Sequence, residues 1–220
     1  MAFFIFTIMK VLAIIPARYA STRFPGKPLV QIAGKAMIQR VYEQSKKSKL
    51  IDRVIVATDH NKIEEELIKI GADYMLTSEN HVNGTERCAE VVHRLKENFD
   101  IILNIQGDEP FIQVDQLDQL IQSFNHKETQ ISTLIKPINH FSSLENPNEV
   151  KVVKASNNKA LYFSRSPIPH VRGIKIAEWL DHQNFYSHIG VYGFRKEVLL
   201  EIVNIPQGKL EKAESLEQLR

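Results

Sequence analysis

The amino-acid sequence predicts an α/β protein with an open, mostly parallel sheet, helices on both faces of that sheet, and a small β-rich lobe. Three observations lead to this prediction. Apolar runs typical of buried strands alternate with amphipathic segments over about the first 135 residues. The later part of the chain changes to short strands in hairpin-like pairs. The 220 residues are 43% hydrophobic and 25% charged, which is ordinary for a globular domain.

The expected strands of the first part are apolar almost throughout, as strands covered on both faces are. The first covers residues 11–15, Val-Leu-Ala-Ile-Ile, and ends at Pro16. Because parallel strands need crossover connections, we expect a helix after most of them. The further strands are expected at residues 53–58, 74–76, 101–105 and 131–135.

The expected helices show apolar residues at helical spacing. Ile63, Leu67 and Ile70 lie at i, i+4 and i+7, and Gly71 ends this helix. Asn61, followed by Glu64, is the expected cap at its start. The other helices are expected after Gly34 and around residues 88–95 and 117–124.

The second half of the chain contains the expected lobe. Strands at residues 150–154 and 161–164 flank the polar stretch 156–159, Ser-Asn-Asn-Lys, which predicts a hairpin. A strand at residues 185–195 and a short helix at 196–203 follow. We expect residues 1–220 to form a single domain, with the lobe included in about residues 136–195.

Residues 1–8 are apolar, and Lys10 separates them from the apolar run of the first strand. The stretch is shorter than the roughly 20 apolar residues that span a bilayer. We therefore expect no membrane insertion, and interpret residues 1–8 as a surplus extension with Met9 as an alternative start. A membrane anchor is the less favoured alternative. The single cysteine, Cys88, excludes a disulfide framework and a Cys-rich zinc site, and is expected to be reduced and buried.

The net charge of +2 is unevenly distributed. The first acidic residue is Glu43, so residues 1–42 carry cations only, and the rest of the chain carries a net negative charge. A local cationic zone on a mildly acidic body favours a small anionic ligand over a broad nucleic-acid surface. The six cations are Lys10, Arg18, Arg23, Lys27, Lys35 and Arg40.

The loop after the first strand concentrates this charge. Arg18, Arg23 and Lys27 lie within ten residues without an acid, and Pro25-Gly26 predicts a turn before Lys27. Ligands of open α/β sheets bind at the carboxyl ends of strands, so these cations, with the hydroxyls of Ser21 and Thr22, suit a triphosphate. The loop matches neither the Walker pattern nor G-x-G-x-x-G. A solvated basic loop is the alternative.

A second polar segment follows the strand at residues 101–105. Gly107 allows close backbone approach, and Asp108 lies where a carboxylate can hold Mg²⁺ against phosphates. The alternative for Asp108 is an ordinary turn acid.

These segments also carry a family resemblance. Residues 14–29, Ile-Ile-Pro-Ala-Arg-Tyr-Ala-Ser-Thr-Arg-Phe-Pro-Gly-Lys-Pro-Leu, resemble the signature of the 3-deoxy-manno-octulosonate cytidylyltransferases, also called CMP-Kdo synthetases. Seven further motifs follow in family order up to the last residue. They are Val56-Ala-Thr-Asp-His60, Asn83-Gly-Thr-Glu-Arg87, Gln106-Gly-Asp-Glu-Pro110, Asn146-Pro-Asn148, Leu161-Tyr-Phe-Ser-Arg165, His188-Ile-Gly-Val-Tyr192 and Leu216-Glu-Gln-Leu-Arg220.

The resemblance implies a Rossmann-like nucleotidyltransferase sheet and a cytoplasmic homodimer. It implies that CTP and Kdo (3-deoxy-D-manno-octulosonate) are coupled into CMP-Kdo with release of pyrophosphate, using Mg²⁺, for lipopolysaccharide synthesis. The base for the sugar hydroxyl is not identified. The same transfer to 8-amino-Kdo or a nonulosonic acid, and a nucleotide-binding remnant with little turnover, are the alternatives.

The resemblance also assigns roles to individual residues. Arg18, Lys27 and Asp108 are expected to be catalytic, with Asp108 as the metal ligand. CTP is expected to contact Ala17, Arg18, Ser21, Thr22, Arg23, Lys27, Gly84, Thr85 and Gln106. The acidic sugar is expected to contact Arg23, Arg87, Arg165, His188, Tyr192, Glu217 and Gln218. Family members continue beyond Arg220 with a segment that carries a second metal-binding aspartate, so the metal site expected within this chain is half built.

Overall fold

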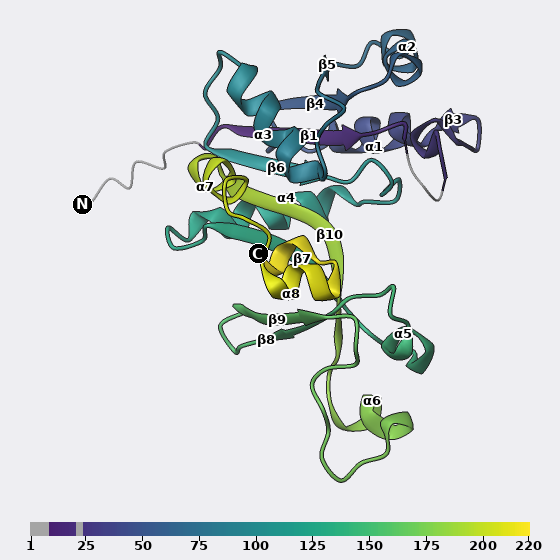
Figure 1. Ribbon diagram of the computed structural model, residues 1–220, viewed down its shortest axis with the longest axis vertical. Helices are drawn as coiled ribbons and strands as arrows, with labels where there is room; N and C mark the ends of the chain where they lie inside the picture. Colours follow the sequence, from purple (N-terminus) through teal and green to yellow (C-terminus); the bar gives the residue numbers. More distant parts are fainter. Residues whose placement is uncertain (1–8, 21–23) are drawn as a thin grey trace. The chain divides into compact units, whose positions relative to one another are not determined.

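The computed structural model describes residues 9–20 and 24–220 (Figure 1). The expected extension at residues 1–8, and the expected ligand contacts Ser21, Thr22 and Arg23, lie outside the described residues. The chain divides into two compact units. The first extends to Ser132 and includes Val191–Val203, and the second consists of Thr133–Gly190 and Asn204–Arg220. The expected lobe therefore falls mainly in the second unit, which also takes in the last residues of the chain.

The sheet of the first unit has the strand order β5-β4-β1-β6-β10. Its first four strands are parallel, and the Val191–Arg195 part of β10 is antiparallel to β6. The apolar strand predicted first along the chain lies near the middle, where Ile14 is opposite both Ile55 and Asn104. The bounds are β1 Val11–Ala17, β4 Arg53–Thr58, β5 Tyr74–Leu76, β6 Ile101–Ile105 and β10 Tyr186–Arg195.

Helices cover both faces of this sheet, as predicted. Leu12 and Ile14 of β1 pack against Cys88 and Val91 of one helix and Leu199 of another. Alternate residues of a strand point to opposite faces, so the residues of β1 next to Leu12 and Ile14 face the other side of the sheet. On that side, α1 packs on β1 and on α4. Cys88 is buried and free, as expected. The bounds are α1 Met37–Ser45, α2 Asn61–Lys69, α3 Gly84–Arg94, α4 Val114–Gln122 and α7 Lys196–Ile202.

The start of α2 corrects one prediction. His60, rather than Asn61, is the N-cap residue, because its ring nitrogen accepts the backbone N–H of Lys62. Ile63 and Leu67 are fully buried, as their spacing predicts, whereas Ile70 lies just after the helix and is half-buried. The observed cap therefore lies one residue before the predicted one.

The second unit contains the predicted hairpin. Strand β8 pairs antiparallel with β9, and the turn between them closes with a hydrogen bond from the Ala155 N–H to the Lys159 carbonyl. Asn158 in this turn has a φ of 65°, a conformation that asparagine tolerates. Strand β8 also pairs with the Tyr186–Ser187 part of β10, so β10 runs through both units. The bounds are β7 Ile131–Pro137, β8 Lys151–Lys154, β9 Ala160–Ser164, α5 Phe141–Glu145, α6 Trp179–His182 and α8 Lys209–Glu214.

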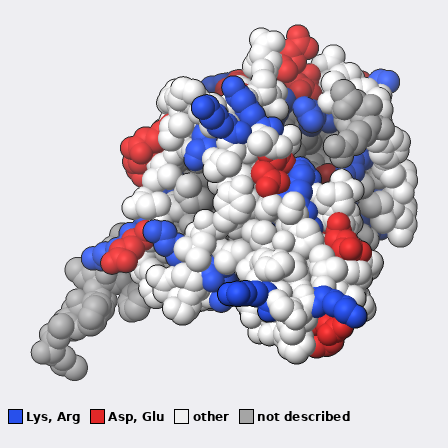
Figure 2. Space-filling view, turned by 60° about the horizontal axis from the view of Figure 1, so that its bottom comes forward, with Lys and Arg blue, Asp and Glu red and all other residues white. Residues whose placement is uncertain are grey.

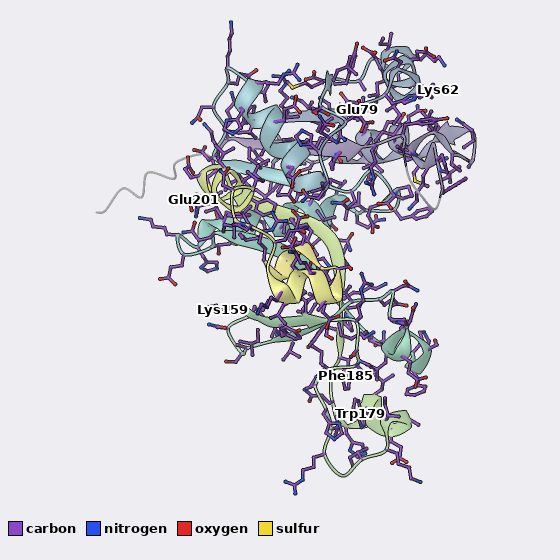
Figure 3. The ribbon with its side chains drawn as sticks, viewed as in Figure 1. Lys62, Glu79, Lys159, Trp179, Phe185 and Glu201 are labelled. Carbon is purple, nitrogen blue, oxygen red and sulfur yellow. The ribbon has the colours of Figure 1, made fainter. Side chains whose placement is uncertain are left out.

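Two apolar clusters hold the second unit together. In one, the rings of Trp179 and Phe185, both labelled in Figure 3, stack with centroids 5.9 Å apart. The indole N–H donates to the Ile174 carbonyl. In the other, Leu216 packs against Val152 and Phe163 of the hairpin. Burying an apolar side chain of this size contributes roughly 1.5–3 kcal/mol, so each cluster stabilises the unit substantially.

The remaining elements are short. Strands β2 (Gln31–Ile32) and β3 (Lys35–Ala36) form a separate antiparallel pair. No helix in the described ranges 9–20 and 24–220 is long and apolar enough to cross a membrane. Single-turn 3₁₀ helices occur at Lys27–Leu29, Ser123–Asn125, Ile176–Glu178 and Glu217–Leu219.

Candidate active site

A cavity of about 610 Å³ lies at the carboxyl ends of β1 and β6 in the first unit. This is where open α/β sheets bind ligands, and the volume suits a small molecule. Its walls come from residues 16–18, 24, 27, 28, 81–84, 87 and 106–108. The structure thus brings together seven of the residues that the sequence assigned to the site: Ala17, Arg18, Lys27, Gly84, Arg87, Gln106 and Asp108.

Two glycines let these segments converge. A Cβ atom on Gly107 would lie 3.0 Å from the Pro16 carbonyl oxygen, so the loop after β6 approaches the end of β1 as closely as backbone allows. A Cβ atom on Gly84 would lie 3.1 Å from the Pro16 ring. The prediction that Gly107 permits close backbone approach is confirmed.

Lys27 and Asp108, which both line the cavity, form an ion pair. The Lys27 Nζ lies 2.5 Å from the Asp108 Oδ2, and the two side chains are 40% and 47% exposed. Gly26, with a φ of 72°, turns the chain immediately before Lys27, as the Pro-Gly pair predicts. An ion pair as exposed as this one contributes about 0–1 kcal/mol, so a highly charged ligand can compete for either partner.

Basic side chains are not gathered into one broad surface on the face shown in Figure 2, where they are interspersed with acidic ones. The cations that bear on the proposed chemistry are those of the cavity, where Arg18 is exposed and Lys27 half-exposed. Their position at the end of a central strand indicates a compact anion site rather than an extended one.

Arg87 lines the cavity, but its guanidinium is already bonded within the protein. Nη2 donates to Asp59 Oδ2 at 2.6 Å and Nη1 donates to Thr77 Oγ1 at 2.5 Å, and the side chain is 3% exposed. The sequence predicts Arg87 as a carboxylate anchor for the sugar, whereas the structure gives it a carboxylate of the protein itself. Asp59 received no role from the sequence, although the Val56–His60 motif contained it.

Thr85 and Gln106 meet at a residue that sequence reasoning missed. Asn104, buried on β6, donates to Thr85 Oγ1 at 3.3 Å and accepts from Gln106 Nε2 at 3.1 Å. Thr85 is 3% exposed and lies behind the cavity wall, whereas Gln106 lines the cavity. The Asn-Ile-Gln spacing, which places both amides on one face of a strand end, was the available signal.

Two carboxylates of α3 shape the wall that holds His81, another residue that sequence reasoning missed. Glu90 Oε2 lies 2.6 Å from His81 Nε2 and accepts the Ser78 N–H, and Glu86 accepts the Val82 N–H at 3.1 Å. Burial raises the pKa of Glu90, but the hydrogen bonds from Ser78, His81 and Arg94 outweigh it and lower the pKa overall. Hydrogen bonds to the carboxylates of Glu86 and Glu90 thus hold the segment that contains His81 against α3.

The other expected sugar contacts lie elsewhere on the chain. Arg165, His188, Glu217 and Gln218 belong to the second unit. Tyr192 lies on β10 in the first unit, half-buried and stacked on Phe194 at a centroid distance of 6.0 Å.

Arg165 connects three segments of the second unit. Its Nε donates to the Glu214 carbonyl at 2.6 Å, Nη1 to the Pro147 carbonyl at 2.9 Å and Nη2 to the Ser215 carbonyl at 3.4 Å. Its backbone N–H donates to the Glu214 carboxylate, and this bond is the main cause of the lowered pKa of Glu214. The guanidinium therefore fastens the end of β9 to the end of α8.

His188 lies 2.8 Å from the Thr133 hydroxyl and packs edge-on against Phe163, and burial lowers its pKa to about 4. With an ordinary pKa of 6.5 in the unfolded chain, unfolding takes up a proton between these values. Stability of the second unit should thus be unaffected above about pH 6.5 and fall by about 2 kcal/mol between pH 7 and pH 5. Urea unfolding followed by fluorescence of Trp179, the single tryptophan, measures this.

The control for this pH dependence is His188→Gln, which retains a hydrogen-bonding group and cannot titrate. Its unfolding free energy should change little over the same pH range. An equal fall in both proteins would assign the effect to other groups.

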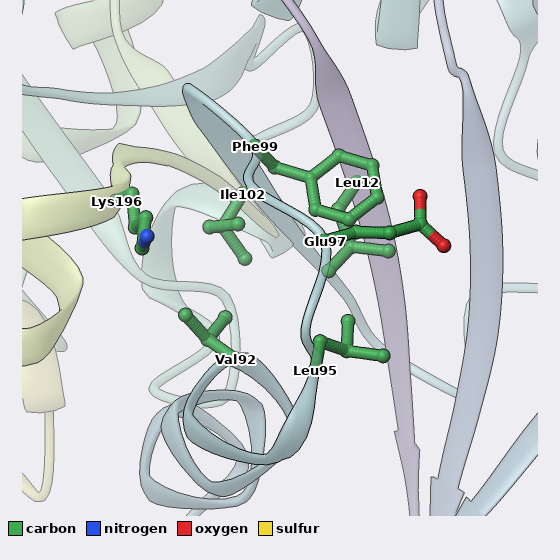
Figure 4. A pocket seen from close by; sticks show the side chains of 7 residues that line it. All are labelled: Leu12, Val92, Leu95, Glu97, Phe99, Ile102 and Lys196. Atoms are coloured by element: carbon green, nitrogen blue, oxygen red, sulfur yellow. The ribbon is translucent and has the colours of Figure 1, made fainter.

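A second, smaller hollow lies between Val92, Leu95, Phe99 and Ile102, with Glu97 and Lys196 also lining it (Figure 4). It has no room for a water-sized molecule, and its apolar residues belong mostly to the core around Leu12. It is a packing defect rather than a ligand site.

Comparisons with known proteins show the family of the chain. A family model described as cytidylyltransferase matches residues 12–220. A 3-deoxy-manno-octulosonate cytidylyltransferase of Parabacteroides distasonis is 53% identical over 97% of this chain and 86% of its own length. One of Bacteroides thetaiotaomicron is 51% identical over 96% and 85%.

A solved CMP:2-keto-3-deoxy-manno-octonic acid synthetase in complex with CTP has the same fold. Its TM-score is 0.88 at 39% identity, over 96% of this chain and 84% of that one. The family match, the fold and the sequence identity over nearly the whole chain agree: the chain belongs to the cytidylyltransferase family, among the 3-deoxy-manno-octulosonate cytidylyltransferases.

Proposed function

We propose that this protein transfers the cytidylyl group of CTP to Kdo, forming CMP-Kdo and pyrophosphate for lipopolysaccharide synthesis. The observation that carries the proposal is the cavity at the ends of β1 and β6, where Lys27 and Asp108 face each other in a chain 53% identical to a named enzyme of this activity. The family resemblance further supports a cytoplasmic homodimer.

The proposed reaction is an attack by the anomeric hydroxyl of Kdo on the α-phosphorus of CTP, with pyrophosphate leaving from the opposite side. Such transfers depend on positioning and on neutralising the phosphate oxygens, and they need no covalent intermediate. Arg18 and Lys27 supply cations at the cavity wall. Cys88, the single thiol of the chain, is buried in the core and takes no part.

The residues of the cavity fit Mg²⁺ as the cofactor. Within residues 9–20 and 24–220, no cluster of three or more His, Cys, Asp or Glu side chains is arranged to hold a metal. Mg²⁺ is commonly held by one or two carboxylates together with substrate phosphates and water, and Asp108 is a half-exposed carboxylate of the cavity. Asp108 would hold the ion, which when bound would neutralise charge on the phosphate oxygens.

The proposal predicts selective binding of CTP. Thermal shifts with CTP, UTP, ATP and GTP in Mg²⁺ should be largest for CTP, because a ligand that binds only the folded state raises its stability. Pyrophosphate release should require Kdo and CTP together and should stop when EDTA removes the metal. Equal or stronger stabilisation by a purine nucleotide would contradict the proposal.

The same assay separates the sugar alternatives. Kdo, 8-amino-Kdo and a nonulosonic acid are compared at equal CTP, and Kdo should give the highest kcat/KM. A higher kcat/KM for either of the other sugars would support cytidylyl transfer as the reaction but would identify that sugar, and not Kdo, as the acceptor.

A further inference from the structure

Asp59 directly follows β4 and is used by no step of the proposed reaction, yet it holds two parts of the site at once. Its Oδ2 accepts the Arg87 Nη2 at 2.6 Å, and its Oδ1 accepts the backbone N–H of Tyr19 at 3.4 Å. The Asp59 side chain is 10% exposed and that of Arg87 is 3% exposed. Arg87 lines the cavity and Asp59 does not, so the carboxylate lies behind the cavity wall.

Tyr19 contacts Gly26, the residue that precedes Lys27. Its ring stacks on His60 with centroids 3.9 Å apart and planes 15° apart. Its carbonyl accepts the Gly26 N–H at 2.9 Å, and a Cβ on Gly26 would lie 3.2 Å from the Tyr19 ring. Because Gly26 immediately precedes Lys27, a displacement of Tyr19 moves the cation that the reaction uses.

Arg87 holds the opposite wall. It lies on α3, whose first residue, Gly84, lines the cavity, and its Nη1 donates to Thr77. Thr77 in turn donates its hydroxyl to the Thr58 carbonyl at 3.1 Å, next to Asp59. The ends of β4, β5 and α3 are thus connected through one guanidinium.

We propose that Asp59 is a positioning residue for cytidylyl transfer: it fixes the Tyr19 end of the basic loop and the Arg87 wall relative to each other. The inference rests on the proposed function for its kinetic readout. Small misplacements of binding groups can cost about a hundredfold in rate. Asp59 is also the acidic partner of the buried Arg87, and losing one member of a buried pair is more damaging than losing both.

Three variants separate the two contacts. Asp59→Asn keeps an acceptor for the Tyr19 N–H and removes the charge that pairs with Arg87, so kcat/KM for CTP should fall about tenfold. Asp59→Ala removes both contacts, and the fall should approach a hundredfold. Asp59→Glu restores the charge and should recover part of the loss.

The control is Asp73→Asn, which neutralises an ion-paired aspartate that is more exposed than Asp59. Asp73 bonds Arg53 Nε at 2.7 Å, also in the first unit, but away from the cavity lining. Its variant should keep kcat/KM within about twofold. CTP affinity without Kdo is measured in parallel at a temperature well below every unfolding midpoint, so that loss of folded protein does not enter.

If Asp59→Asn folds poorly, the same substitution is tested in a second parent variant, Arg87→Met. Arg87→Met removes the buried cation that pairs with Asp59, so adding Asp59→Asn should cost less than about threefold more. An additive tenfold loss there, or parental CTP affinity in Asp59→Ala, would overturn the proposal. A parent chain that binds CTP but releases no pyrophosphate would refute the proposed function, whereas CTP affinity would still decide the role of Asp59.

Discussion

The Lys27→Ala variant should lose ten- to a hundredfold in kcat/KM for CTP while unfolding at nearly the parental temperature. Its ammonium group borders the cavity 2.5 Å from Asp108. A hydrogen bond between charged groups contributes about 1.5–3 kcal/mol, which corresponds to this loss when the anion binds. The exposed ion pair that is also lost contributes at most about 1 kcal/mol to folding.

Lys35→Ala is the matched control for Lys27. Lys35 pairs with Glu43 at 2.6 Å, and the two side chains are 45% and 41% exposed, close to the values for Lys27 and Asp108. It does not line the cavity. Pyrophosphate release should stay within about twofold of the parent. Similar losses in both variants would show that general surface charge, rather than the position of Lys27, supports catalysis.

The Arg165→Ala variant should be destabilised by about 2–4 kcal/mol in the second unit. Three side-chain hydrogen bonds to the carbonyls of Glu214, Pro147 and Ser215 are lost, and each carbonyl left without its partner adds to the cost. Trp179 lies in the same unit, so urea unfolding followed by its fluorescence reports the change. KM for CTP should stay near the parental value.

Arg172→Ala is the control, since Arg172 is an exposed arginine of the same unit. Its unfolding free energy should change by less than about 0.5 kcal/mol. Parental stability in Arg165→Ala, combined with a raised KM for Kdo alone, would instead support the sequence-based role of Arg165 as an anchor for the sugar carboxylate.

The sequence by itself determined the layered sheet and the place of the site. Continuous apolar runs such as Val11–Ile15 are stable only when both faces are covered, and this requires helices on both sides. Parallel strands bring their carboxyl ends to one edge, so the basic loop after β1 and the Gln106–Asp108 segment after β6 had to meet. The close backbone approach at Gly107 could also be predicted from the sequence, because the absence of a Cβ atom is a property of that single residue.

The tertiary structure alone decided which acceptors the buried and half-buried arginines bond. The Arg87 guanidinium finds the Asp59 carboxylate across 28 positions. The Arg165 guanidinium finds the backbone carbonyl of Glu214 across 49 positions. Periodicity specifies whether a side chain is buried, but not which donor meets which acceptor once distant segments pack together. Two arginines expected to bind the sugar therefore proved to be bonded within the protein. Asp59 stayed unassigned because its role depends on two partners that only the folded chain brings within reach.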